Sequence, residues 1–405
     1  MTESRLRQAG FWGAVCLALA LQGCATAPSR LPAVPSELTS KAEIPGMPGV
    51  RYVGGGDMTE LSRIALESVR IEQVLLAKQG PLPPSVFLAI SGGGDNGAYT
   101  AGLLNGWTAA GTRPEFKLVT GSSTGALIAP FAFLGPKYDA TLKEVYTTIS
   151  PKDVLVPRSL IAGFLGDAMA DNAPLWQLTR KSVTADLLKE IAAEYAKGRF
   201  LLIATADLDA RRPIIWDMGR IASYGTPQAL DLFVSIMIAS ASIPGGFPPT
   251  MIDVEAGGKR YQEMHVDGGT MAQVFVYPAS IKIKEQGLAA GIDRERRLYV
   301  IRNARLDPDW AHVERSTMSI AGRAVASLIH TQGIGDLYRI YATAQRDGVD
   351  FNLTFIPSTF NVPHKEEFDN EYMRKLYDVG YDLAVKGMRW VKAPPGYEAP
   401  TAAGR

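Results

Sequence analysis

The sequence predicts an α/β domain of three layers with a mostly parallel central sheet. Short apolar runs at residues 86–90, 116–120 and 298–301 are typical of strands buried on both faces. Segments with helical spacing separate these runs, and alternating strands and helices indicate a layered α/β architecture. Because no linker is evident within 85–390 of the 405 residues, one large domain is favoured.

The elements are expected in a regular order. A capping-box pattern at 57–60 begins an amphipathic helix that ends near Gly80. A glycine-rich turn and a helix ending at Gly111 follow the first strand. Pro130 is expected to kink or shorten the helix after the second strand. Later strands are expected at 199–206, 213–216, 260–266 and 351–356, and later helices at 183–197, 226–240, 367–388 and 312–347, the last interrupted near Gly333 and Gly335.

Residues 1–23 read as a signal peptide rather than as part of the fold. The apolar run 11–21 follows basic residues and is too short to span a bilayer as a mature helix. The sequence that ends at Cys24 resembles the lipobox of bacterial lipoproteins, which implies cleavage before Cys24 and its lipidation. Ala25, where Asp would retain a lipoprotein at the inner membrane, favours the outer membrane, facing the periplasm of the bacterial cell envelope. An ordinary signal peptide with an incidental cysteine stays open.

The two ends of the mature chain are expected to lie outside the domain. Residues 24–56 are rich in Pro, Ser, Thr, Ala and Gly without periodicity, which predicts a flexible tether. The domain is expected over 57–392, and 393–405 is expected to be a disordered tail.

Composition excludes several kinds of partner and bond. The chain has 42 Lys and Arg against 41 Asp and Glu, so no net field favours nucleic acid. It has two cysteines, and the first lies in the signal peptide, so no intrachain disulfide is expected in the mature chain.

A G-x-S-x-G motif at 121–125 lies between an expected strand and an expected helix. In that context the motif indicates a nucleophile elbow, in which a tight turn presents the hydroxyl of Ser123. Gly121 and Gly125 would keep side chains away from the turn. An ordinary glycine-serine loop is the alternative for these five residues taken alone.

A second glycine-rich turn spans residues 92–97 and also fits G-x-G-x-x-G. A dinucleotide site would need an acid at the end of the second strand, but Glu115 lies at the wrong end of that strand. The carboxyl ends of neighbouring parallel strands meet at one edge. The N–H groups of Gly93 and Gly94 can therefore stabilise an oxyanion beside Ser123.

A catalytic serine needs a base, and the chain has only four histidines: His265, His312, His330 and His364. None lies in a glycine-rich turn. Asp267 follows an expected strand and precedes Gly268 and Gly269. A carboxylate can act as base when burial raises its pKa toward neutrality. A hairpin Asp-Gly turn is the alternative interpretation.

Four blocks occur together and in order: 92–94, 121–125, 240–249 and 267–269. Over about residues 85–385 the chain resembles the patatin-like phospholipase family. The resemblance implies a serine–aspartate dyad of Ser123 and Asp267, an oxyanion hole at Gly92, Gly93 and Gly94, and no metal or other cofactor. One departure is Asn96, where the family usually has Arg or Lys, beside the acidic Asp95.

The expected function is that of a lipid acyl hydrolase, of phospholipase A or lysophospholipase type. It would act on membrane phospholipids or other lipid esters through an acyl-serine, with apolar surface from Ile243 to Pro249 for the acyl chain. Two alternatives stay open: a histidine-dependent serine esterase using Asp267 and His330, and a non-catalytic lipid-binding envelope lipoprotein, for which Asn96 is the best support.

Overall fold

The computed structural model describes residues 30–76, 82–159, 162–163 and 166–397. The predicted signal peptide and Cys24 lie outside the described residues. Within them, no helix combines the length and the apolar character needed to cross a membrane.

The described chain forms one nine-stranded sheet in the order β1-β7-β6-β3-β2-β10-β11, with the hairpin β8–β9 attached to β6. Five consecutive strands, from β6 to β11 along this order, run parallel. β1, β7, β8 and β9 pair in antiparallel fashion. The strands are β1 (Arg51–Val53), β2 (Ser85–Ile90), β3 (Leu118–Gly121), β6 (Phe200–Asp207), β7 (Arg212–Asp217), β8 (Thr250–Ala256), β9 (Lys259–Asp267), β10 (Arg296–Arg302) and β11 (Asp350–Phe355); β4 (Val156–Pro157) and β5 (Ala170–Asp171) pair separately.

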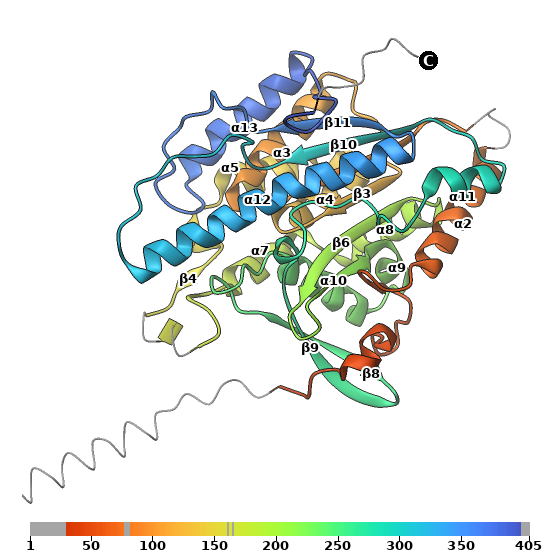
Figure 1. Ribbon diagram of the computed structural model, residues 1–405, viewed down its shortest axis with the longest axis horizontal. Coiled ribbons are helices and arrows are strands. Elements are labelled where there is room, and N and C mark those ends of the chain that lie inside the picture. Colours follow the sequence, from red (N-terminus) through yellow and green to blue (C-terminus); the bar gives the residue numbers. More distant parts are fainter. Residues whose placement is uncertain (1–29, 77–81, 160–161, 164–165, 398–405) are drawn as a thin grey trace, which may run out of the picture.

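Helices cover both faces of the sheet and confirm the predicted three layers. In Figure 1, α12 lies across one face of the sheet, and α2 and α11 lie side by side. Apolar side chains of α2, α11 and α12 belong to one hydrophobic core. Those of α3, α4, α5, α10 and α13 belong to a second core. The helices are α2 (Thr59–Leu76), α3 (Gly97–Ala109), α4 (Thr124–Leu134), α5 (Asp139–Thr148), α7 (Ala173–Ser182), α8 (Ala185–Ala196), α9 (Met218–Ser223), α10 (Pro227–Ser240), α11 (Ile283–Ala289), α12 (Thr317–Arg346) and α13 (Asn370–Val385).

The strand β6 positions the site because it is longer than its neighbour β3. Ile203 of β6 pairs with Gly121, the last residue of β3. Two residues farther along, Thr205 pairs with Asp267, the last residue of β9. β6 therefore holds Asp267 just beyond the point where β3 ends and the Ser123 turn begins.

The expected strands are all present, but some details of the helices differ from the prediction. α12 is continuous through Gly333 and Gly335. A Cβ at Gly333 would lie 2.0 Å from Nη1 of Arg302, so this glycine makes room for an arginine and does not interrupt the helix. α4 contains Pro130 and ends soon after it, at Leu134. The elements that were not predicted include α5, α7, α9, α11, β1 and β8.

The predicted tether is wrong for residues 30–56. β1 pairs with β7, and Ile44, Met47 and Val50 are buried. The buried Arg51 forms an ion pair with the buried Glu263, at 2.9 Å. The irregular spacing of these apolar residues hides their burial from any test of periodicity.

The predicted C-terminal tail also begins too early. Val391 forms a β-bridge with Leu353, and Ala393 is buried. The ring of Tyr397 packs against Tyr341 at 5.5 Å between centroids. Residues 393–397 therefore belong to the domain, and 398–405 lie outside the described residues.

Candidate active site

Ser123 lies on a strained turn between β3 and α4. Its φ of 55° and ψ of −128° are unusual for a residue with a side chain. A Cβ at Gly121 would lie 2.3 Å from the carbonyl oxygen of Gly125, and a Cβ at Gly125 would lie 2.3 Å from that of Ile90. Both positions therefore require glycine, as a nucleophile elbow does.

Ser240, the last residue of α10, connects this turn to the sheet. Its Oγ accepts the Ser123 N–H at 3.0 Å and donates to the Ala204 carbonyl at 2.7 Å. The sequence analysis singled out the block 240–249 but predicted no contact for Ser240. A serine at the end of a wholly apolar helix face is the only signal that points to a buried polar role.

Asp267 is buried and lies close to Ser123. Its Oδ1 accepts the N–H of Gly269 at 2.7 Å, and its own N–H donates to the Ser242 carbonyl at 2.9 Å. Oδ2 has no hydrogen-bond partner of standard geometry among the described residues. Burial raises the pKa of Asp267 to about 7, against the lowering effects of the Ser123 hydroxyl and the Gly269 N–H. The structure thus brings together a serine and a carboxyl group that titrates near neutrality.

The glycine loop runs beside Ser123, but its three N–H groups differ. The Gly92 N–H donates to the carbonyl of Gln273 at 3.0 Å and is not available to an oxyanion. The N–H groups of Gly93 and Gly94 make no hydrogen bond within the described part of the chain. A Cβ at Gly93 would lie 2.3 Å from the Asn303 carbonyl oxygen, so this loop packs too closely for a side chain. Of the three glycines predicted to form the oxyanion hole, only Gly93 and Gly94 therefore have a free N–H group.

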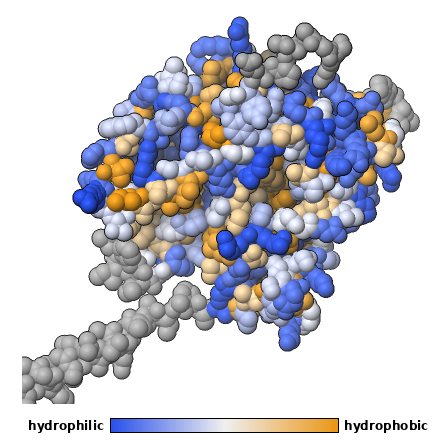
Figure 2. Space-filling model, viewed as in Figure 1, coloured by the Kyte–Doolittle hydropathy of each residue, from blue (hydrophilic) through white to orange (hydrophobic). Residues whose placement is uncertain are grey.

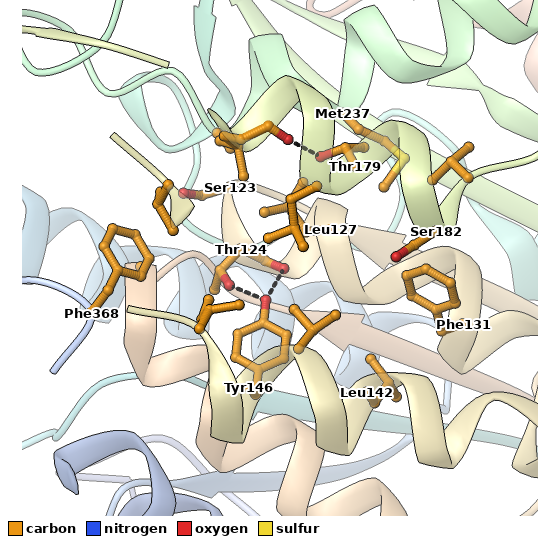
Figure 3. A pocket seen from close by; sticks show the side chains of 18 of the residues that line it. Ser123, Thr124, Leu127, Phe131, Leu142, Tyr146, Thr179, Ser182, Met237 and Phe368 are labelled. Atoms are coloured by element: carbon orange, nitrogen blue, oxygen red, sulfur yellow. Dashed lines mark hydrogen bonds between the residues drawn. The ribbon is translucent and has the colours of Figure 1, made fainter. Parts of the chain in front are cut away.

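An apolar cavity of about 790 Å³ adjoins Ser123. Figure 3 shows Ser123 and Phe368 on one side of the cavity and Phe131 and Ser182 on the opposite side. Ile243 and Phe247 contribute to the lining, in the segment where the sequence predicted apolar surface. Its mostly apolar lining is typical of pockets that bury the hydrocarbon part of a ligand.

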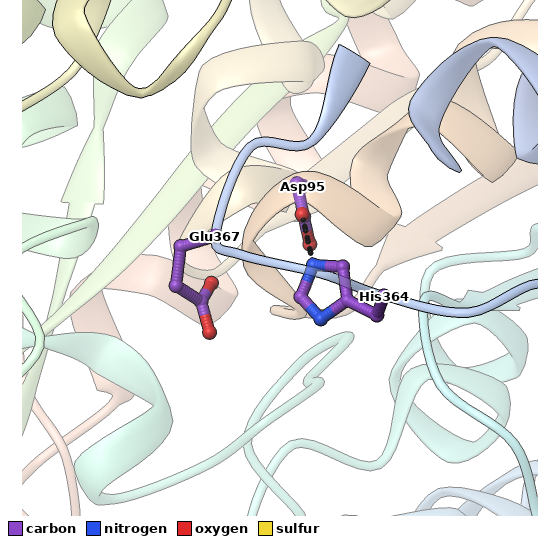
Figure 4. Close-up of side chains that lie close together, drawn as sticks. All are labelled: Asp95, His364 and Glu367. Atoms are coloured by element: carbon purple, nitrogen blue, oxygen red, sulfur yellow. Dashed lines mark hydrogen bonds and ion pairs between the residues drawn. The ribbon is translucent and has the colours of Figure 1, made fainter. Parts of the chain in front are cut away.

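The Asp95 carboxylate beside the loop has partners from a distant segment. It accepts hydrogen bonds from Nε2 of His364 at 2.7 Å and from the N–H of Phe368 at 2.9 Å (Figure 4). With Glu367, these side chains place three ligand atoms within 4.8 Å of one another, and His and carboxylate are metal-ligand types. Asn96, at the position of the departure from the family pattern, accepts a hydrogen bond from the Tyr372 hydroxyl at 2.7 Å.

His265 has its partners away from Ser123. His265 is buried and shares hydrogen bonds with Thr205 at 2.9 Å and Glu263 at 3.0 Å. His330 lies on α12. Among the described residues, no histidine contributes to the hydrogen bonds or the pKa shift of Asp267. The structure therefore does not assemble the alternative triad.

Comparisons with known proteins bear on the same segment. A sequence model of the family "Patatin-like phospholipase" matches residues 88–280. A search of curated protein sequences found no match.

Solved structures with a similar arrangement include VipD from Legionella pneumophila, at 12% identity and a TM-score of 0.38, covering 76% of this chain and 67% of VipD. They also include the type III effector protein ExoU, at 12% identity and a TM-score of 0.31, covering 76% of this chain and 53% of ExoU. A complex of SpcU with ExoU from Pseudomonas aeruginosa gives 14% identity, a TM-score of 0.27, and coverage of 76% and 52%. The chain thus spans about half the length of ExoU.

The family match contains the elbow, the glycine loop and Asp267. The chain carries a patatin-like phospholipase domain at residues 88–280.

Proposed function

We propose that this protein is a lipid acyl hydrolase of phospholipase A or lysophospholipase type, with Ser123 as nucleophile and Asp267 as general base. One observation carries the proposal. The buried carboxyl of Asp267, with a pKa near 7, lies beside a serine on a strained turn that adjoins an apolar cavity. A base with a pKa near the working pH transfers protons most effectively.

Acylation begins when Asp267 accepts the Ser123 proton, with Oδ2 as the oxygen left free for it. Oγ then bonds to the ester carbonyl carbon, and the carbonyl oxygen becomes an oxyanion. The free N–H groups of Gly93 and Gly94 stabilise this charge. Donors of this kind lower the barrier by about 3–4 kcal/mol each.

Deacylation returns the site to its starting state. The protonated Asp267 gives its proton to the departing alkoxide as the C–O bond breaks, which releases a lysolipid or alcohol. Water then gives a proton to Asp267, and its oxygen bonds to the acyl carbonyl carbon. As the bond between the acyl group and Ser123 Oγ breaks, Asp267 returns this proton to Oγ, and the fatty acid leaves. No step calls on a histidine.

The substrate assignment to lipid esters rests on the cavity and on the surface. The cavity lining is almost wholly apolar and suits an acyl chain. Exposed apolar residues follow the first half of α12, where Figure 2 shows apolar groups gathered: Met318, Ile320, Val325 and Leu328. Such a patch supports contact with a lipid surface. Lipidation of Cys24 in a bacterial envelope, which the lipobox resemblance supports, would hold the enzyme at its substrate.

Lipid product analysis tests the proposal. The full-length protein, Ser123→Ala, Asp267→Asn and His330→Ala are incubated with vesicles of mixed phospholipids and with neutral esters, and fatty acids and lysolipids are quantified. We expect release by the wild type and by His330→Ala, and none above background for the other two variants. Loss of activity in His330→Ala with activity kept in Asp267→Asn would favour the histidine-dependent esterase, and no release by any protein would favour the non-catalytic lipoprotein.

A further inference from the structure

A second cavity of about 860 Å³ lies at the opposite end of the parallel strands from Ser123. Its lining includes Phe87 of β2, Leu118 of β3 and Phe200 of β6, which are near the amino ends of these parallel strands. Ser123 follows the carboxyl end of β3. Residues of α2 and α11, two helices that lie side by side in Figure 1, also line the cavity. It is therefore separate from the cavity beside the nucleophile.

Three cationic side chains line this otherwise apolar space: Lys117, Arg294 and Arg296. Glu72 pairs with Lys117 at 3.0 Å and with Arg294 at 2.8 Å, so one carboxylate serves two cations. Arg294 and Arg296 are two positions apart on extended chain, and Nη1 of Arg296 donates to the Arg294 carbonyl at 3.2 Å. Among the described residues, Arg296 has no ion-pair partner within 4.0 Å.

Other charged groups nearby do not balance the excess of positive charge at this cavity. Asp293 and Asp347 act on Arg296 from a distance, but Asp347 is paired with Arg346 at 2.7 Å. Arg294 acts on both other cations and lowers their pKa values, after the larger effect of burial. A positive charge without a counter-ion thus remains at the wall of an apolar cavity.

Arg294 also has an unused donor. Its side chain is buried, and Nε has no hydrogen-bond partner among the described residues. Unpaired buried donors are rare because each loses its hydrogen bonds to water and gains nothing in return. An anionic group in the cavity would supply both the missing acceptor and the missing counter-charge.

We propose that this cavity binds a long-chain fatty acid, with the chain against the apolar lining and the carboxylate at Arg294 and Arg296. The apolar lining disfavours a small polar anion, which would bury no apolar surface against it. The excess of positive charge selects a carboxylate over an alcohol or a neutral ester, because charge-assisted hydrogen bonds are the stronger ones. This site does not depend on the proposed hydrolase activity.

Calorimetric titration of oleate into the full-length Ser123→Ala protein tests the site, because this variant cannot turn over a lipid. Leu127→Trp is added to fill the cavity beside residue 123, of which Leu127 is a lining residue. Ala65→Trp fills the second cavity, and circular dichroism verifies that it is folded. Arg296→Gln removes the unpaired cation. Arg297→Gln is the matched control, because Arg297 is partly exposed and is paired with Glu295 at 2.6 Å.

We expect oleate to bind with one-to-one stoichiometry whether or not Leu127→Trp is present. Ala65→Trp should abolish binding, Arg296→Gln should weaken it about tenfold or more, and Arg297→Gln should leave it unchanged. Oleyl alcohol should bind at least about tenfold more weakly than oleate. Binding that Leu127→Trp abolishes and Ala65→Trp leaves intact, or equal affinity for oleate and oleyl alcohol, would overturn the proposal.

Discussion

At the residue scale, the pKa of Asp267 sets the pH dependence of the proposed reaction. Burial raises this pKa to about 7, and only the deprotonated carboxylate can accept the Ser123 proton. We therefore expect kcat/KM to rise with pH and to level off above an apparent pKa near 7. Initial rates on a soluble ester between pH 5 and 9 measure this. A profile that is already flat at pH 5 would contradict a base with a raised pKa.

The same shift predicts a gain in stability for Asp267→Asn. The folded pKa lies above the ordinary aspartate value of 3.8, so the folded state holds this proton more tightly than the unfolded state. The stabilising contribution is complete below about pH 4 and is lost as pH rises to about 7, a change on the order of 4 kcal/mol. Removing the charge should therefore raise the free energy of unfolding relative to wild type by more at pH 8 than at pH 4.5.

Urea unfolding at the two pH values provides the comparison. Asp378→Asn is the control, because Asp378 is exposed on α13. It should change stability equally at both. An equal effect of Asp267→Asn at pH 4.5 and pH 8 would mean that the charge of Asp267 does not destabilise the folded protein.

Ser240 gives a third prediction at this scale. Ser240→Ala removes the acceptor of the Ser123 N–H and the link to Ala204. The turn should lose its fixed orientation, and kcat should fall about tenfold to a hundredfold with little change in KM. Ser235→Ala on the same helix is the control, because its hydroxyl donates only to the helix carbonyl of Asp231. Equal kinetics for the two variants would contradict a role of Ser240 in holding the Ser123 turn.

The candidate site could be predicted only as far as local sequence determines it. Ser123, Asp267 and the glycine loop each have a local signature of glycines next to a strand end. The engaged N–H of Gly92 and the contacts of Ser240 depend on carbonyls brought together by the fold. No local pattern encodes such contacts.

At the scale of elements, α3 and α13 pack through glycines. A Cβ at Gly102 would lie within van der Waals overlap of the Tyr377 carbonyl oxygen, at 1.9 Å, and one at Gly106 would lie 2.3 Å from that of Tyr381. The sequence predicts both helices but not this contact, because they are separated by most of the domain. The glycine loop leads directly into α3, so the packing of α3 on α13 also determines where the loop lies.

Gly102→Ala should therefore destabilise the protein by about 1–3 kcal/mol or more, because the helices must separate. Gly322→Ala on α12 is the matched control, since nothing lies within 4 Å of its added Cβ. It should stabilise the helix by up to about 1 kcal/mol. Urea unfolding of both variants decides the point, and equal effects would contradict the close packing of α3 on α13.

At the scale of the whole molecule, residues 30–56 form part of the fold. β1 extends the sheet beyond β7, and Arg51 neutralises the buried Glu263, which also contacts His265. The parallel core could be predicted because its strands are apolar runs. This edge could not, because it rests on a three-residue strand and one buried ion pair.

The protein that lacks residues 1–56 should thus have a lower melting temperature than the protein that lacks residues 1–29. Breaking a buried ion pair alone costs about 3–5 kcal/mol. Arg51→Met in the full chain isolates that part of the loss. Equal melting temperatures for the two truncated proteins would show that 30–56 is a tether after all.

The most direct test of the account is the labelling of Ser123 by a fluorophosphonate, located by peptide mass spectrometry and followed over pH. We predict a single label on Ser123, formed at a rate that rises through about pH 7, lost in Asp267→Asn and kept in His330→Ala. A label on another residue, or labelling that survives Asp267→Asn and fails in His330→Ala, would contradict the serine–aspartate dyad.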